Sequence, residues 1–239
     1  MAARKNQTPL NEAGIEMSWR REPVSLLGID DRARVWDQGH ILTLQRRDVL
    51  FAANDRADTL YYVRSGRLKL EMGGPGGDDT IIVGMRSACG LAGYRSIIAG
   101  ERHSATATAL EPTSLIGIPR KLALDIFDRN QKMANYVVRL MARQVKASNH
   151  RLWAMTHKQL RGRLADTLLL LRDTFGYAAA TRDIDIELTR EELAQMSNMN
   201  TANAIRTLSS FTAEGFVKPN GRKITIIDEE TLRKTSETG

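Results

Sequence analysis

The sequence predicts an α+β fold: an antiparallel β-roll in the first half, one long helix, and a winged helix-turn-helix at the end. Short apolar or alternating runs broken by turn residues fill residues 41–118, which is the pattern of small antiparallel sheets. Residues 131–155 contain neither Gly nor Pro. We therefore expect four segments in chain order: a flexible arm, the β-roll, the long helix and the helix-turn-helix region, which cover residues 1–22, 23–130, 131–156 and 157–239.

Seven short runs carry the β-roll prediction. Turn signals such as Asn54-Asp55 and Ser65-Gly66 separate them, and no helical pattern lies between most of them, which favours a roll over alternating β-α units. The expected strands cover residues 41–45, 49–52, 59–64, 67–72, 80–85, 105–110 and 114–118.

Composition narrows the class of protein. The 239 residues include 42% hydrophobic residues and one cysteine, Cys89, which cannot form an internal disulfide and fits a reducing compartment. No apolar run is long enough to cross a bilayer, and no apolar segment follows Arg4 and Lys5 as a secretory signal would require. We expect a cytoplasmic protein without membrane contact.

The net charge of +7 favours a polyanionic partner. From His157 onward, however, 12 Lys and Arg stand against 12 Asp and Glu. The excess charge therefore lies in the first part of the chain, and local patches must locate any nucleic-acid surface.

The long helix carries a heptad-like apolar stripe. Its members alternate in steps of four and three: Ala134, Val138, Met141, Val145, Ser148, Leu152 and Met155. Such a seam predicts a two-stranded pairing with a second copy, and we assign Val138, Met141, Val145 and Leu152 to the interface of a homodimer. Burial inside one subunit is the alternative, although about 40 Å of helix is long for it. A second stripe, Met133, Val137 and Leu140, is expected to pack on the β-roll.

Residues 189–211 predict two short helices joined by a tight turn. Thr189 and Glu192 form a capping box, and Ser197-Asn198-Met199 forms the turn, since Asn tolerates a positive φ. Asn200 or Thr201 is expected to cap the second helix, which runs to about Phe211. Ala194, Ile205 and Leu208 are expected to form the shared core. This is a helix-turn-helix.

A two-stranded wing should follow, with strands at 216–218 and 223–227 and a turn at 219–222. In a helix-turn-helix the second helix enters the major groove of DNA, so Arg206 is suited to guanine and Asn203 to adenine. Basic wing residues and the start of the first helix suit phosphates. The predicted contacts to double-stranded DNA are Thr189, Arg190, Asn200, Thr201, Asn203, Arg206, Lys218, Arg222 and Lys223.

Several motifs together resemble the cyclic-AMP receptor and fumarate–nitrate regulator family (Crp/Fnr). They are Leu60-Tyr61-Tyr62-Val63-Arg64-Ser65-Gly66-Arg67-Leu68-Lys69, Gly90-Leu91-Ala92-Gly93, Arg102-His103-Ser104-Ala105, Thr189-Arg190-Glu191-Glu192-Leu193-Ala194 and Ala204-Ile205-Arg206-Thr207-Leu208. The resemblance extends from about residue 28 to residue 227. It implies a cyclic-nucleotide-binding-like β-roll, a homodimer and sequence-specific DNA-binding regulation of transcription, with RNA polymerase as a further partner.

The sequence departs from that family at the residues that bind the effector. Cyclic-nucleotide-binding members carry Glu where this chain has Leu91, and Arg where it has His103, with Arg102 one place back. An effector pocket is expected at Gly90, Leu91, Arg102, His103 and Ser104, but cyclic AMP is not the expected ligand. The recognition helix also differs: Thr201 and Ala202 stand where the family often has Arg-Glu, and only Arg206 is kept.

No cofactor or metal is expected, and the effector stays open. One cysteine cannot hold an iron–sulfur cluster, which usually needs four thiolates. By residue type alone, four histidines are candidate haem ligands: His40, His103, His150 and His157. We expect all four at the surface instead.

Two other classes of function are alternatives to a DNA-binding regulator. An enzyme is disfavoured because the sequence shows no metal-ligand spacing, no phosphate-binding loop and no nucleophile–base pair. A ligand-binding or protein-interaction regulator without specific DNA readout is the second alternative, supported by the balanced charge after His157. Salt dependence separates it from a true DNA-binding protein.

Overall fold

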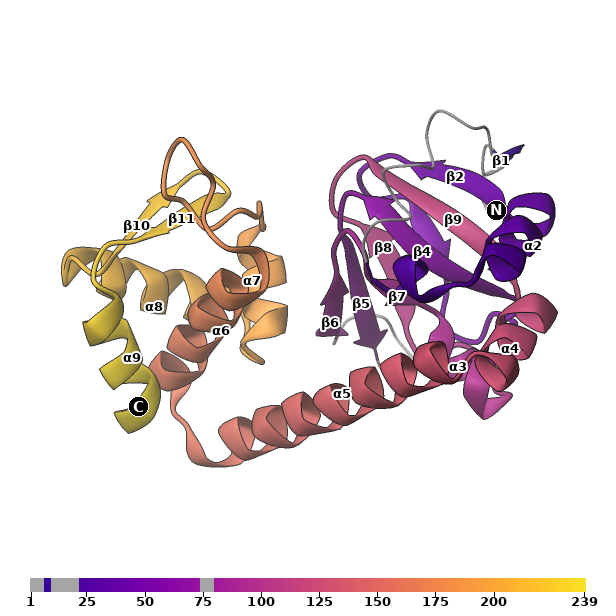
Figure 1. Cartoon of the computed structure of the whole chain (residues 1–239). Helices are drawn as coiled ribbons and strands as arrows, with labels where there is room; N and C mark the ends of the chain where they lie inside the picture. Colours follow the sequence, from indigo (N-terminus) through magenta and orange to yellow (C-terminus); the bar gives the residue numbers. More distant parts are fainter. Residues whose placement is uncertain (1–6, 10–21, 74–79) are drawn as a thin grey trace. The chain divides into compact units, whose positions relative to one another are not determined.

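The computed structural model describes residues 7–9, 22–73 and 80–239. The chain divides into two compact units, Met1–Arg143 and Gln144–Gly239, shown with their elements in Figure 1. The division falls inside the long helix α5 (Gln131–His157) rather than at either of its ends.

Two antiparallel sheets form the first unit. The larger has the order β1-β2-β9-β4-β7 and the smaller the order β3-β8-β5-β6. The strands of the larger sheet are β1 (Gln7–Pro9), β2 (His40–Leu44), β9 (Thr113–Pro119), β4 (Thr59–Ser65) and β7 (Leu91–Ala92). Those of the smaller sheet are β3 (Val49–Phe51), β8 (Thr106–Ala109), β5 (Leu68–Gly73) and β6 (Thr80–Arg86). The seven predicted strands are present within two residues of their expected ends, and the β-roll is confirmed.

Each face of the larger sheet has its own apolar core. One core lies between the sheets and includes Leu42, Val63, Leu68, Ala107 and Leu115. The other lies under helices on the opposite face of the larger sheet, where residues of β4 and β9 meet α2 (Ile29–Gln38), α3 (Tyr94–Ala99), α4 (Arg120–Arg129) and the start of α5. Figure 1 shows these helices beside the roll. The roll is thus a sandwich of two sheets, and helices cover the outer face of the larger sheet.

The second stripe of α5 belongs to this helical core. Met133 and Val137 are 3% and 4% exposed, and Leu140 packs against the same cluster in part, as predicted. Met141, which we assigned to the dimer seam, is also partly covered by this cluster. Its side chain is therefore shared between the roll and the exposed face of the helix.

Five described elements of the first unit were not predicted: β1, β7, α2, α3 and a short 3-10 helix, η2 (Val24–Leu26). The strand β1 pairs antiparallel with β2, Gln7 opposite Leu42, so these three residues of the predicted flexible arm are part of a sheet. The remainder of the arm, residues 1–6 and 10–21, lies outside the described residues. The α2 segment buries only Val35 fully, which leaves little apolar periodicity to detect.

The long helix ends one residue later than predicted, at His157. The Thr156 hydroxyl donates to the carbonyl oxygen of Leu152 at 3.2 Å, and the Lys158 amide donates to that of Ala154 at 3.0 Å. These bonds continue the helical turn through Thr156 and His157, across the predicted boundary between the long helix and the helix-turn-helix region. The connection to α6 (Leu160–Phe175) is instead Lys158-Gln159.

Five elements follow α6 in the second unit. They are α7 (Arg190–Met196), α8 (Thr201–Ala213), β10 (Val217–Asn220), β11 (Lys223–Ile226) and α9 (Glu229–Thr238). Buried apolar side chains of α6, α7 and α8 meet in one core, which includes Leu164, Leu168, Leu193, Leu208 and Phe211, each at most 3% exposed. The arrangement is a winged helix-turn-helix, as predicted.

Candidate nucleic-acid interface and sensor pocket

The first helix of the motif begins with the predicted capping box. The Thr189 hydroxyl accepts from the Glu192 amide at 3.1 Å, and the Glu192 carboxylate accepts from the Thr189 amide at 2.8 Å. The turn after α7 also has the expected form, because Asn198 adopts a φ of 50°. The Ser197 hydroxyl anchors this turn by donating to Thr167 of α6 at 3.0 Å. The two helices are therefore held in a fixed relation.

Asn200 caps the second helix, α8. Its side-chain oxygen accepts from the Asn203 amide at 2.8 Å, so this part of Asn200 is occupied by the cap. The buried face of α8 consists of Ala204, Thr207, Leu208 and Phe211. Ile205, which we expected in the shared core, is 46% exposed. The reason is that the buried residues recur at 204, 208 and 211, and Ile205 lies about 100° around the helix from Ala204.

The exposed face of α8 carries the predicted base-reading residues. Thr201 and Arg206 are exposed and Asn203 is half-buried. The Arg206 guanidinium donates to the side-chain oxygen of Asn203 at 3.0 Å. The Asn203 side-chain oxygen, which a bidentate contact to adenine would also use, thus already accepts one hydrogen bond and holds the arginine.

Ionic contacts fix the other end of α8 to α6. The Arg161 guanidinium lies 2.7 and 2.8 Å from the two Glu214 carboxylate oxygens and 2.6 Å from the Ser210 hydroxyl. It also lies 4.9 Å from the centre of the Phe211 ring. The hydrogen bonds from Arg161 and then from Ser210 lower the pKa of Glu214 to about 2. The helix α8, which we call the reading helix, is therefore held at both of its ends.

The wing differs from its prediction in one respect. Pro219 and Asn220 belong to β10 and pair with Ile224 and Lys223, so the turn shortens to Gly221-Arg222. Gly221 permits this tight turn with a φ of 58°. The error arose because Pro and Asn are turn residues by propensity, although Pro is tolerated in an edge strand.

The wing's basic residues differ in their freedom. Lys218 and Arg222 are exposed, and Lys223 is half-buried with its ammonium 3.8 Å from a Glu187 carboxylate oxygen. The Arg190 guanidinium, at the start of α7, donates to the Gly221 carbonyl at 2.9 Å. This bond brings the tip of the wing next to the start of the first helix, so predicted phosphate contacts from both elements lie close together.

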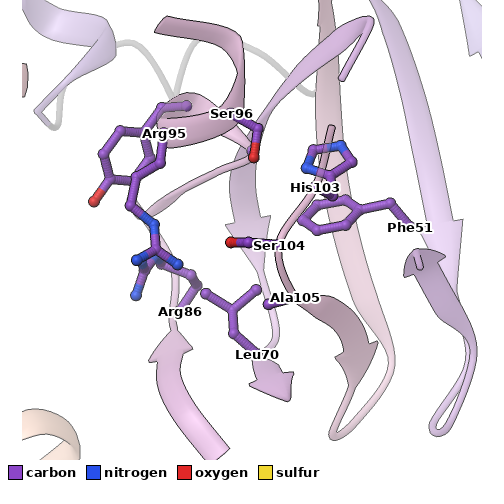
Figure 2. A pocket seen from close by; sticks show the side chains of 10 residues that line it. Phe51, Leu70, Arg86, Arg95, Ser96, His103, Ser104 and Ala105 are labelled. Atoms are coloured by element: carbon purple, nitrogen blue, oxygen red, sulfur yellow. The ribbon is translucent and has the colours of Figure 1, made fainter. Parts of the chain in front are cut away.

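A pocket opens in the β-roll (Figure 2). Its empty space is about 290 Å³, counting the part open to solvent. Arg86 and Arg95 stand on one side of it and the rings of Phe51 and His103 on the other. The full lining is Phe51, Leu70, Arg86, Gly93, Tyr94, Arg95, Ser96, His103, Ser104 and Ala105.

His103 is a buried residue of this pocket, 4% exposed, and not the surface histidine that we expected. Its ring stacks on Phe51 with 3.7 Å between centroids and 12° between planes. Its backbone is fixed as well, since its amide donates to the Asp55 carbonyl at 3.0 Å. The His103 ring therefore forms part of the pocket wall and is held there by its stacking contact with the apolar Phe51 ring.

Models of two domain families cover most of the chain. The cyclic nucleotide-binding domain matches residues 41–130, and the Crp-like helix-turn-helix domain matches residues 162–235. The chain belongs to the Crp/Fnr family of transcription regulators.

Named relatives agree with this assignment. The chain is 26% identical to the fumarate and nitrate reduction regulatory protein of Vibrio cholerae, over 79% of this chain and 75% of that protein. It is 24% identical to the CRP-like cAMP-activated global transcriptional regulator of Mycobacterium tuberculosis, over 79% of this chain and 84% of that protein. The structure of FixK2 from Bradyrhizobium japonicum shares the fold, with a TM-score of 0.74 and 17% identity over 84% of this chain and 98% of that chain.

This member of the Crp/Fnr family brings only part of the predicted effector pocket together. His103 and Ser104 line the cavity, but Gly90, Leu91 and Arg102 do not. Leu91 is 1% exposed in the helical core, and Arg102 is exposed and donates to the Asn54 carbonyl at 2.6 Å.

Sequence reasoning missed Phe51, Arg86 and Arg95. Arg86 comes from β6, donates to the Leu91 carbonyl at 2.9 Å, and has its pKa lowered by burial. Phe51 belongs to a strand remote in sequence from the motif at 90–105, and the folded roll brings it there. Arg86 lies just before that motif and Arg95 inside it, but neither is one of the motif's predicted pocket residues. No local pattern in the sequence marks them.

The described residues, 7–9, 22–73 and 80–239, contain no group of three or more His, Cys, Asp or Glu side chains placed to hold a metal ion. Within the same ranges, no helix is both long and apolar enough to span a bilayer.

Proposed function

We propose that this chain is a sequence-specific, DNA-binding transcription regulator that works as a homodimer. The observation that carries the proposal is the winged helix-turn-helix with its reading helix fixed at both ends and polar side chains on its exposed face. In such motifs the second helix lies in the major groove with its first turns at the base edges.

The exposed residues fit distinct roles in a DNA complex. Arg206 is the residue best suited to guanine, whose O6 and N7 accept from one guanidinium. Asn203 orients that arginine, and Asn200 acts as a cap. Thr189, Thr201, Arg190, Lys218, Arg222 and Lys223 supply contacts that position the duplex, through hydroxyl groups or positive charge.

The seam of α5 supports the homodimer. Val138, Val145 and Leu152 recur every seven residues and are 64%, 59% and 64% exposed. A second copy of the helix would cover these apolar side chains by knobs-into-holes packing. Residues 131–157 contain no acidic residue, so apolar packing rather than interhelical ion pairs would hold the two chains together. Two reading helices then address half-sites about one turn of DNA apart.

We further propose that cyclic AMP is not the effector. The position of the family's ribose-binding carboxylate is an apolar side chain in the core, Leu91, and the ring of His103 is stacked on Phe51. The pocket, part of which is open to solvent, is also smaller than most ligand sites. Calorimetric titration of the purified protein with cyclic AMP should give no saturable heat at micromolar ligand. Saturable binding in that range would contradict this part of the proposal.

No iron–sulfur cluster is proposed either, because the sequence has a single cysteine and such clusters usually need four. The positive charge of Arg86 and Arg95 favours an anionic effector. The protein is not proposed to be an enzyme. As a regulator of transcription it would act together with RNA polymerase, which is a proposed partner.

Selection from a random duplex pool tests DNA readout directly. The purified chain should enrich one pseudo-palindromic sequence, and affinity for it should fall steeply as salt rises, because phosphate contacts release counterions. The alternative, a regulator without specific readout, is favoured by the zero net charge of residues 157–239. Failure to enrich any sequence at low salt would support that alternative and contradict the proposed function.

A further inference from the structure

The reading helix presents an apolar centre. Its exposed residues are Thr201, Ala202, Ile205, Arg206, Ser209, Thr212 and Ala213. At about 100° per residue, Ile205, Ala202 and Ser209 occupy the middle of this face, with Thr201 and Arg206 at its edges. Ile205 is 46% exposed and lies four residues after Thr201 and three after Ala202, so these side chains are neighbours on the helix surface.

The arginine of this face does not cover the isoleucine. The Arg206 guanidinium donates to Asn203 at 3.0 Å, and Asn203 lies on the side of Arg206 away from Ile205, by the same helical geometry. A large apolar side chain at the centre of a groove-facing surface is therefore left open to whatever fills the groove.

We propose that Ile205, together with Ala202, selects thymine through its 5-methyl group, next to the base pair that Arg206 contacts. This inference rests on the proposed function. The thymine methyl is the apolar group of the major-groove code, whereas the other base edges there are hydrogen-bond donors and acceptors. Covering such a polar edge with Ile205 would remove it from water without a replacement hydrogen bond, which is unfavourable.

The apolar pair therefore both favours thymine and rejects the other bases. Because a symmetric dimer presents two copies of α8, one selected thymine is expected in each half-site.

Deoxyuridine substitution tests the inference, since it removes only the methyl group and keeps every hydrogen-bonding atom of the base. The duplex that the wild-type chain enriches from a random pool is remade with each thymidine replaced in turn. At one position per half-site the dissociation constant should rise about fourfold, the value for one buried methyl group. Replacement in both half-sites should raise it about fifteenfold.

Variants connect this penalty to the side chain. In Ile205→Ala the deoxyuridine effect should shrink to less than about twofold, while Arg206 still discriminates its own base pair. The matched control is Ile227→Ala, an isoleucine 59% exposed at the end of β11 remote from the wing turn, and it should keep the full penalty. Both positions are exposed, and equal midpoints of urea unfolding will show that the variants fold.

The possible failures are distinguishable. If a duplex is enriched but no deoxyuridine weakens binding, or if the penalty persists in Ile205→Ala, the thymine inference is wrong and the proposed DNA-binding function stands. If no duplex is enriched at all, both are overturned.

Discussion

At the scale of single residues, Arg206 and Asn203 form one functional unit. Their 3.0 Å hydrogen bond orders the guanidinium before DNA arrives, which reduces the entropy lost on binding. The planar arginine side chain can then donate two parallel bonds to one guanine. In the proposed complex, base selection would therefore depend on the orientation of Arg206 as much as on its charge.

Replacement of Arg206 separates these two contributions. Arg206→Ala should weaken binding to the selected duplex by about 1–3 kcal/mol, with a smaller loss on random duplex. Arg206→Lys keeps the charge but loses the bidentate geometry, so it should restore binding to random duplex but not to the selected one. Fluorescence anisotropy at fixed salt measures both. Equal weakening of the two duplexes in Arg206→Ala would mean that Arg206 contacts phosphate only.

At the scale of elements, the contact between α6 and α8 decides how rigidly the reading helix is presented. Arg161 reaches Ser210 and Glu214 near the end of α8 and covers the Phe211 ring. The Ser197 hydroxyl, which donates to Thr167 of α6 at 3.0 Å, holds the turn before the other end. Because the pKa of Glu214 is lowered to about 2, the ion pair persists through the whole range of physiological pH.

This pKa shift predicts a window of acid sensitivity. The folded value of about 2 lies below the ordinary value of 4.5, so the contact stabilises the fold fully above pH 4.5 and loses that contribution as pH falls towards 2. Glu214→Gln should flatten the pH dependence of the unfolding midpoint between these values. Glu237→Gln, an exposed glutamate of α9, is the control and should leave it unchanged. An identical acid profile for wild type and Glu214→Gln would show that the contact is absent in solution.

Alternating and helical periodicity were enough to predict the elements that bury many apolar side chains. The seven strands, α5, α7 and α8 all fall in this group. The short or polar elements β1, β7, α2 and α3 had no such signal. The wing turn was misplaced by Pro219, and Ile205 was misplaced because its hydrophobicity suggested burial. In the pocket, Phe51 and Arg86 reach His103 only through tertiary folding, which a local motif cannot express.

At the scale of the whole molecule, the proposed binding to DNA depends on two chains that pair along α5. Tight binding by a dimer comes from two half-sites held at a fixed distance, and the loss of one half costs a factor of about 100 or more. The exposed Val138 and Val145 are where two charges would most strongly oppose pairing without disturbing either compact unit.

The most direct test measures the mass in solution and the affinity for the selected duplex of the double variant Val138→Asp, Val145→Asp. Sedimentation should show the wild type at twice the mass of one chain and the variant at a single chain, with its affinity reduced about a hundredfold or more. Leu170→Asp, at an apolar α6 position 47% exposed, should behave as wild type. If the double variant remains dimeric, or binds the duplex as a single chain with undiminished affinity, the proposed symmetric DNA-binding dimer paired along α5 is wrong.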